Sequence, residues 1–265
     1  MSFALHHAAV QPIRMPPRLS PVPATAAAPV AALGTRCSSC HLRELCLPCG
    51  LGASDMDRID DLKFGRRRVK MGQTIYRAGD DFRFIYAVRM GTFKSELTLA
   101  DGRDQVSGFH MGGELMGLDG IANGKHASSA VALEDAEICA IPYAQLSDVS
   151  VSSAELQHAV SRLMSREIVR EHSLMMLLGS MNAEERLAAF LLNLSIRLKA
   201  RGYSPSEFHL RMSREEIGSY LGMKLETVSR TFSAFQKRRL LDVDKRFIRI
   251  IDAHALSQAF EMRVH

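Results

Sequence analysis

The chain has 265 residues, 46% of them hydrophobic, and a formal net charge of +5 at pH 7. That length suits one large domain or two ordinary ones, and the composition is sufficient for a well-buried core. No apolar stretch reaches the roughly 18 to 20 residues that span a bilayer, so we expect no membrane partner.

Residues 1–36 are the first predicted region, a disordered arm. Seven of the nine prolines fall within the first 50 residues, a composition that cannot bury enough surface to fold. Pro21, Pro23 and Pro29 interrupt the alanine-rich run, so no continuous signal peptide forms. Without export we expect a cytoplasmic protein, in which disulfides are rare and clustered cysteines bind metal or do redox chemistry.

Four of the five cysteines lie in the segment CSSCHLRELCLPC, residues 37–49, and the fifth, Cys139, lies ninety positions further on. The pattern is C-x2-C-x5-C-x2-C. Two closely spaced pairs, Cys37/Cys40 and Cys46/Cys49, suit a zinc site. A [4Fe–4S] cluster also needs four thiolates, and it commonly takes three from one loop and one from a distance. The spacing alone leaves zinc, redox-active thiols and an iron–sulfur cluster open.

Residues 37–151 are predicted to hold this sensory loop and an antiparallel β-roll. Short segments with β-branched and aromatic residues, separated by glycines, are typical of a jelly roll: TIYRAG, FIYAVRMG, GTFKSEL and DQVSGFH. Asp101 and Gly102 predict a hairpin turn with positive φ. His110 and His126 are isolated in the sequence, and we expect them to be structural or exposed.

Residues 152–181 are predicted to form a long helix without proline. Alternating spacings of three and four residues define a seam: Ser161, Met164, Ile168, Glu171, Met175 and Leu178. Such a seam predicts packing against a second copy of the same helix, while Leu163, Leu174 and Leu177 face the chain's own domain. Glu171 would meet its twin in a symmetric dimer. Two such carboxylates repel and resist desolvation, which predicts a marginal and therefore switchable dimer.

Residues 182–265 are predicted to form a winged helix-turn-helix. Three helices are expected, from the Asn182 cap to Gly202, from Ser213 to Gly222, and over MKLETVSRTFSAFQKRR; FHLRM is expected as a strand and LLDVDKRFIRII as a hairpin. Ser213 and Glu216 have the spacing of a capping box. From Ala183 onward the chain has 15 Lys or Arg and 10 Asp or Glu, an excess equal to the whole chain's charge. That excess favours a polyanionic partner, double-stranded DNA, although charge alone equally fits a basic soluble domain.

The second helix of this motif carries Glu226, Ser229 and Arg230 in the half that faces the major groove. A carboxylate accepts from cytosine N4, a guanidinium binds guanine, and a hydroxyl suits either. Lys224 and Thr227 are predicted to contact phosphate, which positions the protein without specifying sequence. Outside this context, Glu226 and Arg230 would fit an ordinary ion pair on the surface of a helix.

Five segments together resemble the FNR group, the oxygen-sensing iron–sulfur regulators of the cyclic AMP receptor protein superfamily. They are CSSCHLRELCLP, GFHMGGELMGLDGI, ALEDAEICAIPY, NAEERLAAFLLNLSIRLKARGYSP and LGMKLETVSRTFSAFQK. The resemblance runs from about Cys37 to the C-terminus. It implies an α+β chain with an N-terminal β-roll, a long dimerisation helix and a C-terminal winged helix-turn-helix, and a regulator that is not an enzyme.

The resemblance also implies a ligand set and a mechanism. Cys37, Cys40, Cys46 and Cys139 match the positions that hold one [4Fe–4S] cluster per subunit, and Cys49 matches no ligand position. The intact cluster would favour a homodimer, and oxygen would convert it to a [2Fe–2S] form, weaken the dimer and release DNA. Glu226, Ser229 and Arg230 would read a TTGAT-type half-site of an inverted repeat, and exposed β-roll loops would recruit RNA polymerase.

Two residues argue against cyclic nucleotide binding. Where the cyclic-nucleotide branch of the superfamily has a glutamate for the ribose and an arginine for the phosphate, this chain has Leu118 and Ala127. The alternative to an iron–sulfur sensor is the same architecture with structural zinc or redox-active thiols. An iron–sulfur electron carrier or enzyme is disfavoured by the helix-turn-helix and by the lack of a phosphate-binding glycine loop or a catalytic constellation.

Overall fold

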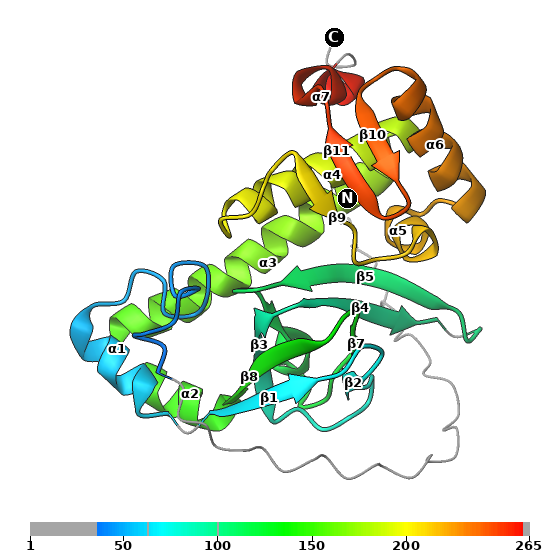
Figure 1. Cartoon of the computed structure of the whole chain (residues 1–265). Coiled ribbons are helices and arrows are strands. Elements are labelled where there is room, and N and C mark those ends of the chain that lie inside the picture. Colours follow the sequence, from blue (N-terminus) through cyan, green and yellow to red (C-terminus); the bar gives the residue numbers. More distant parts are fainter. Residues whose placement is uncertain (1–35, 63, 100, 262–265) are drawn as a thin grey trace, which may run out of the picture.

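The structure, a computed structural model, describes residues 36–62, 64–99 and 101–261 (Figure 1). Apart from Arg36, the arm predicted over residues 1–36 lies outside the described residues. Among the described residues, no helix is long and apolar enough to cross a membrane.

The N-terminal domain is an antiparallel β-roll of two four-stranded sheets, as the sequence predicted. One sheet has the order β1 (Gly65–Val69), β8 (Ala136–Pro142), β3 (Phe84–Met90), β6 (Leu115–Met116), and the other has the order β2 (Thr74–Tyr76), β7 (Ser129–Ala132), β4 (Thr92–Thr98), β5 (Asp104–Met111). Val88, Phe93 and Ile138 are among the residues fully buried in its core. The β4–β5 hairpin turns at Gly102, whose φ is +84°.

Three short helical elements in this domain were not predicted from the sequence. They are α1 (Ala53–Asp60), the 3-10 turn η1 (Leu118–Gly120) and α2 (Tyr143–Val151). Ile59 of α1 and Leu146 of α2 join Leu156 of the following helix in one apolar cluster at the end of the β-roll. These short helices therefore owe their stability to packing against their neighbours, since helices of this length are marginal alone.

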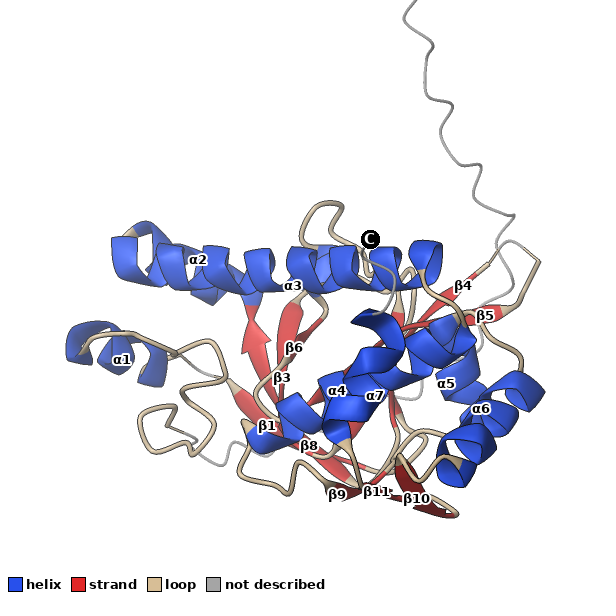
Figure 2. Ribbon diagram, turned by 90° about the horizontal axis from the view of Figure 1, so that it is seen from above, coloured by secondary structure: helices blue, strands red, loops and turns tan. Residues whose placement is uncertain are grey.

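The long helix α3 (Ala154–Ser180) runs beside the β-roll and leads into the C-terminal domain (Figures 1 and 2). It begins where the Ser153 hydroxyl accepts a hydrogen bond from the Leu156 N–H, two residues inside the predicted 152–181. Its first turns bury Leu156 and Ala159, and its later turns are largely exposed.

The C-terminal domain is a winged helix-turn-helix, as predicted. Its elements are α4 (Ala183–Lys199), β9 (Glu207–His209), α5 (Arg214–Leu221), α6 (Leu225–Lys237), β10 (Leu241–Asp244), β11 (Phe247–Ile250) and α7 (Ala253–Glu261). Capping boxes form at both predicted starts, Asn182 with Glu185 and Ser213 with Glu216. The strand expected over FHLRM covers residues 207–209 instead, where it pairs with β11. The helix α7 was not predicted.

The two domains share an apolar core. Val106, Phe109 and Met111 of β5 belong to the same buried cluster as Leu191 and Phe235 of the C-terminal domain. The backbone N–H of Val106 also donates to the Ser219 hydroxyl of α5 at 2.9 Å. The β4–β5 hairpin therefore holds the C-terminal domain against the β-roll.

Candidate metal centre and nucleic-acid interface

The cysteine loop forms one wall of a small cavity beside the first sheet. Cys37, Cys40, Cys46 and Cys139 all line this cavity, and Cys49 does not. Cys139 lies on β8, where it pairs with Arg66 of β1 on one side and Ala87 of β3 on the other. The sheet thus brings the distant cysteine to the three from the loop, and the apparent second pair, Cys46/Cys49, does not face one space.

Apolar packing holds this loop in place. Leu42 and Leu47 are 7% and 3% exposed. Turns within the loop are closed by backbone hydrogen bonds, among them Cys40 N to Cys37 O at 3.1 Å and Cys46 N to Leu42 O at 3.0 Å. These short turns aim several thiols at the same side of the loop.

Three of the thiols in this cavity, those of Cys37, Cys46 and Cys139, have raised pKa values. Burial raises the pKa of Cys37 and raises that of Cys46 to about 12, and the charges of neighbouring thiolates add to both shifts. Burial also raises the pKa of Cys139, although the Arg89 guanidinium opposes it. Such thiols give up their protons to a thiophilic metal group, which replaces several protons at once.

The donors in this cavity are of a kind that suits either zinc or an iron–sulfur cluster, because both take cysteine thiolates as ligands. In the part of the chain that the structure describes, no three His, Cys, Asp or Glu side chains converge closely enough to hold a metal ion. The four thiols share one cavity without meeting at one point.

Two arginines, not predicted from the sequence, lie next to these thiols. Arg89 Nη1 is 3.7 Å from Cys40 Sγ, and Arg89 Nε is 3.2 Å from a carboxylate oxygen of the buried Glu137. Arg66 pairs with the same carboxylate. An iron–sulfur group held by four thiolates is anionic, so guanidiniums at this edge would stabilise it.

The helix α6, drawn in Figure 1, carries the predicted base-reading residues, and these are exposed to solvent. Glu226, Ser229 and Arg230 are exposed, as is Lys224, and Thr227 is half-buried, whereas Val228 and Phe232 on the other face are buried. The structure records no ion pair between Glu226 and Arg230, both of which it describes. Both side chains are therefore available to a partner.

Arg214, at the start of α5, was not predicted as a site residue. Its guanidinium lies 3.3 Å from the centre of the Phe232 ring on α6, and its Nη1 is buried without a hydrogen-bond partner. Burial lowers the pKa of Arg214 to about 10. The contact stacks the two helices of the motif against each other.

The predicted seam of α3 is largely uncovered. Ile168 and Met175 are 55% and 68% exposed, and Ser161 and Glu171 are exposed as well. Met164 and Leu178 are half-buried. Leu163 and Leu177 pack on the chain's own apolar clusters, as expected. Met164, Ile168 and Glu171 of the seam also border the space between α3 and the β-roll, which the prediction of two separate faces did not include. Burial, and then the neighbouring Glu167 charge, raise the pKa of Glu171.

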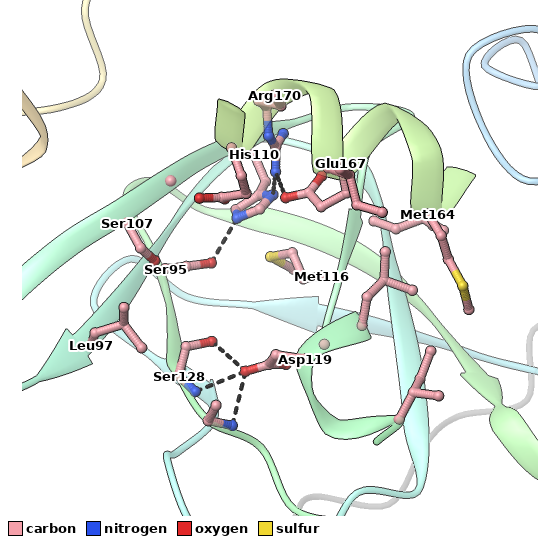
Figure 3. Close-up of a pocket in the computed structure, with 18 of the residues that line it drawn as sticks. Ser95, Leu97, Ser107, His110, Met116, Asp119, Ser128, Met164, Glu167 and Arg170 are labelled. Atoms are coloured by element: carbon pink, nitrogen blue, oxygen red, sulfur yellow. Dashed lines mark hydrogen bonds and ion pairs between the residues drawn. The ribbon is translucent and has the colours of Figure 1, made fainter. Parts of the chain in front are cut away.

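A second cavity, of about 460 Å³, lies between the β-roll and α3 (Figure 3). The Asp119 carboxylate in it accepts hydrogen bonds from Ala127 N at 2.9 Å and from the N–H and hydroxyl of Ser128, both at 2.8 Å. The His110 ring contacts Ser95 Oγ at 2.6 Å and Arg170 Nη2 at 3.3 Å. The polar groups of this cavity are largely paired with one another.

Both histidines that looked isolated in the sequence are buried and partnered. Burial, and then the Arg170 charge, lower the pKa of His110 to about 3. His126 stacks on Tyr76 with ring centres 3.8 Å apart. Their partners come from other strands and from α3, so nothing near them in the sequence indicated these positions.

Comparisons with known proteins extend over both domains. Residues 66–153 match the cyclic nucleotide-binding domain family and residues 185–259 the Crp-like helix-turn-helix domain family. The chain is 48% identical over 230 residues to the transcriptional regulatory protein btr of Bordetella pertussis, which covers 87% of this chain and 95% of that protein. It is 42% identical over 222 residues to the fumarate and nitrate reduction regulatory protein of Escherichia coli K12, with 84% and 89% covered. The solved structure of FixK2 from Bradyrhizobium japonicum superimposes with a TM-score of 0.69 at 28% identity, over 74% of this chain and 96% of that one.

Proposed function

The chain belongs to the Crp/FNR superfamily of DNA-binding transcription regulators, and from that premise we propose that it is an oxygen-responsive member that carries one [4Fe–4S] cluster per subunit. It is a regulator and not an enzyme. We further propose that it acts in the cytoplasm, where its DNA is. Relatives named as fumarate and nitrate reduction regulatory proteins support a role in the control of transcription.

One observation carries the proposal. The cavity beside the first sheet is lined by Cys37, Cys40, Cys46 and Cys139, the four cysteines expected to be ligands, and by no other cysteine. When bound there, the cluster supplies the chemistry that responds to oxygen. The thiols of the loop and of β8 would hold it, and the Arg89 and Arg66 guanidiniums would offset its negative charge.

The chain's own residues would then couple the loaded cavity to dimerisation. Cys37 and Cys46 belong to the apolar cluster that also contains Leu156 and Leu163 of α3. Ordering of the loop against β8 would therefore stiffen the first turns of α3. The exposed seam at Ile168 and Met175 would pack on its copy in a homodimer, against the repulsion between the two Glu171 carboxylates. Loss of the ordered loop would tip this balance toward the monomer.

The dimer would place two α6 helices on the half-sites of an inverted repeat. Glu226, Ser229 and Arg230 would read base edges of a TTGAT-type half-site, while Lys224 and Thr227 would contact phosphate. Exposed loops of the β-roll would recruit RNA polymerase. Cyclic nucleotide is not part of the proposed mechanism, although the matched domain family is named for it.

The test is purification under nitrogen, followed by a visible spectrum, metal analysis, and DNA binding before and after exposure to air. We expect a brown protein with four irons per chain that binds the inverted repeat only under nitrogen. A colourless protein that contains zinc and binds the same DNA in air would support the zinc alternative. Reversible loss of binding on thiol oxidation without any metal would support redox-active thiols.

The base-reading assignment has its own test. Arg230→Ala should weaken binding by about 1–3 kcal/mol and relax the preference at one base pair. Lys224→Ala is the matched control from the same helix start. It should weaken binding equally to specific and scrambled DNA and reduce the salt dependence. Equal effects of the two variants on specificity would remove Arg230 from the reading set.

A further inference from the structure

The turn that joins β5 to β6, residues 112–114, is in contact with the cysteine loop. A Cβ placed on Gly113 would lie 2.7 Å from the Cβ of Leu45, and one on Gly112 would lie 3.2 Å from Leu42 Cδ1. Gly113 also has a φ of +86°, which L-residues rarely adopt. The loop and the turn thus approach so closely that a movement of Leu42 or Leu45 must displace the turn.

The same turn is bound from the DNA-binding domain. The Gly112 carbonyl of the turn accepts a hydrogen bond from Arg201 Nε at 2.6 Å, and the Phe109 carbonyl of the preceding strand β5 accepts one from Arg197 Nη2 at 2.7 Å. Arg197 lies in the last turn of α4 and Arg201 just beyond it. The backbone of the turn is therefore contacted both by the cysteine loop and by the end of α4.

Glu114 joins these contacts to the dimerisation helix. Its carboxylate accepts from Arg197 Nη2 and from Arg201 Nη2, each at 2.6 Å, and lies 3.5 Å from Arg170 Nη1 of α3. The Glu114 and Arg197 side chains are each 18% exposed and the Arg201 side chain 6%. One carboxylate thus links three guanidiniums from two elements outside the β-roll.

Glu114 and the three arginines around it form an ion cluster, and the pKa of Glu114 depends on how these arginines are placed. Burial alone would raise the pKa of Glu114, but the guanidiniums of Arg197, Arg201 and Arg170 outweigh it and lower the pKa to about 2. Arg170 is further held by Glu167 and by the neutral His110 ring. Leaving such buried charges unpaired is costly, so the cluster favours an assembled or a released arrangement over intermediate ones.

We propose that Glu114 is the positioning residue that couples the cysteine loop to both the dimerisation helix and the DNA-binding domain. The route runs from Leu42 and Leu45 through Gly112 and Gly113 to Glu114, and from there to Arg170 on α3 and to Arg197 and Arg201 at the end of α4. The coupling deepens the proposed function and rests on it, because the signal is the ordering of the cysteine loop.

The coupling explains how one event reaches two distant surfaces. Displacement of the loop would free the turn and misalign the Glu114 carboxylate. Arg170 on one side and Arg197 and Arg201 on the other would then lose their common partner together. The seam of α3 and the orientation of α6, which α4 supports in the shared core, would loosen in one step.

The experiment compares Glu114→Gln with Glu134→Gln in anaerobically prepared, cluster-loaded protein. Glu134 is a matched control because it also forms an ion pair between the domains, with Arg211 at 3.3 Å, but lies outside the turn. We expect Glu114→Gln to keep its visible spectrum, dimerise more weakly and bind the inverted repeat about tenfold more weakly or worse. Glu134→Gln should stay within about twofold of the parent. A loaded Glu114→Gln protein with unchanged dimerisation and DNA affinity overturns the proposal.

A second variant covers the case in which Glu114→Gln does not fold. Leu42→Ala leaves Glu114 and its three arginines in place and removes the side-chain atoms, Cδ1 and Cδ2, that approach Gly112. We expect it to load its cluster and to bind DNA more weakly, with Leu97→Ala on the exposed part of β4 as its control. Leu42→Ala that retains its cluster and full DNA affinity argues equally against the coupling.

Failure of the coupling and failure of the proposed function are distinguishable. If the parent protein takes up no cluster, or binds DNA equally in air, the proposed function fails whatever the variants do. The coupling between the cysteine loop and the end of α4 is then tested in cluster-free protein by amide hydrogen exchange. Glu114→Gln should speed exchange both in residues 37–49 and in residues 197–203, and a change confined to residues 107–114 would contradict the link.

Discussion

The cysteine cavity and the cavity against α3 differ in how their polar groups are satisfied. In the cysteine cavity, four groups of one kind face a common space, and burial keeps Cys37, Cys46 and Cys139 protonated. In the cavity against α3, Asp119 takes three hydrogen bonds from Ala127 and Ser128. A cavity with convergent soft donors can hold a metal group, whereas one whose polar groups bind each other presents few to a ligand.

The contrast indicates where the signal enters. The cavity against α3 belongs to the domain matched to cyclic nucleotide-binding proteins, yet its polar groups mostly bind one another. The cysteine cavity lies beside the loop that contacts the turn before Glu114. We therefore expect changes at the first cavity to alter the proposed signal, and changes at Asp119 or His110 of the second cavity to have only structural effects.

The largest effect should come from Cys46→Ser, which removes one of the four thiols. We expect loss of the visible spectrum and of DNA binding under nitrogen, because the three remaining thiols cannot supply the four ligands that a [4Fe–4S] cluster needs. Cys49→Ser is the matched control, three residues away and outside the cavity, and should keep both. A brown, active Cys46→Ser protein beside a colourless Cys49→Ser protein would reverse the ligand assignment.

Glu171→Ala should bypass the first cavity. Glu171 is at the seam of α3, and its pKa is raised by burial and by Glu167, so a second copy of the same carboxylate would add repulsion. Its removal should shift the air-exposed protein toward a DNA-binding dimer, by about tenfold or more in dimer dissociation constant. Sedimentation in air measures this, with Gln157→Ala on the same helix as control. A Glu171→Ala protein that stays monomeric contradicts the seam.

His110→Gln should change pH dependence at the second cavity without removing the signal. The folded-state pKa of His110, about 3, lies below its ordinary value of 6.5. The unfolded chain therefore binds the extra proton, and stability falls as the pH drops below about 6.5. Around the ring, Arg170 and Arg197 reinforce this shift and Glu114 opposes it.

The measurement is urea unfolding of cluster-free protein at about pH 6.5 and about pH 5. Glu114, with an ordinary pKa of 4.5, contributes to the pH slope of both proteins, so the difference between the two slopes reports on His110. We expect the parent to lose up to about 1.4 kcal/mol per pH unit more than His110→Gln. Glu167→Gln serves as a control in the same cavity, since it leaves the ring in place. Equal pH slopes for parent and His110→Gln would show that the ring takes up its proton in the folded state.

The smallest effect should come from adding cyclic AMP to the parent protein. The amides of Ala127 and Ser128 already bind Asp119, and Leu118 and Ala127 offer no partner to a ribose or a phosphate. We expect no change in DNA affinity under nitrogen and no heat of binding in calorimetry. A nucleotide-dependent change in either would make the second cavity a sensor after all.

Much of the local structure was predictable because it depends on neighbours in the chain. The capping boxes at Asn182 and Ser213, the turn at Gly102 and the exposed face of α6 all follow from short-range hydrogen bonds and from hydrophobic periodicity. The short helices α1, α2 and α7 were not predicted, because their stability comes from contacts with other elements. The strand near Phe208 was displaced for the same reason, since its pairing partner is β11.

By itself the sequence determined the order of the domains and the side chains that α6 turns outward, and the resemblance implied a set of four thiols that stays a prediction. Only the tertiary structure decided which groups meet across the fold: Cys139 beside the loop, His110 beneath Arg170, and Glu114 among arginines from α3 and α4. The residues in these contacts lie 56 to 102 positions apart in the sequence, and Cys139 is placed by the pairing of β8 with β3. Their energies depend on burial and on exact placement, which no local pattern in the chain encodes.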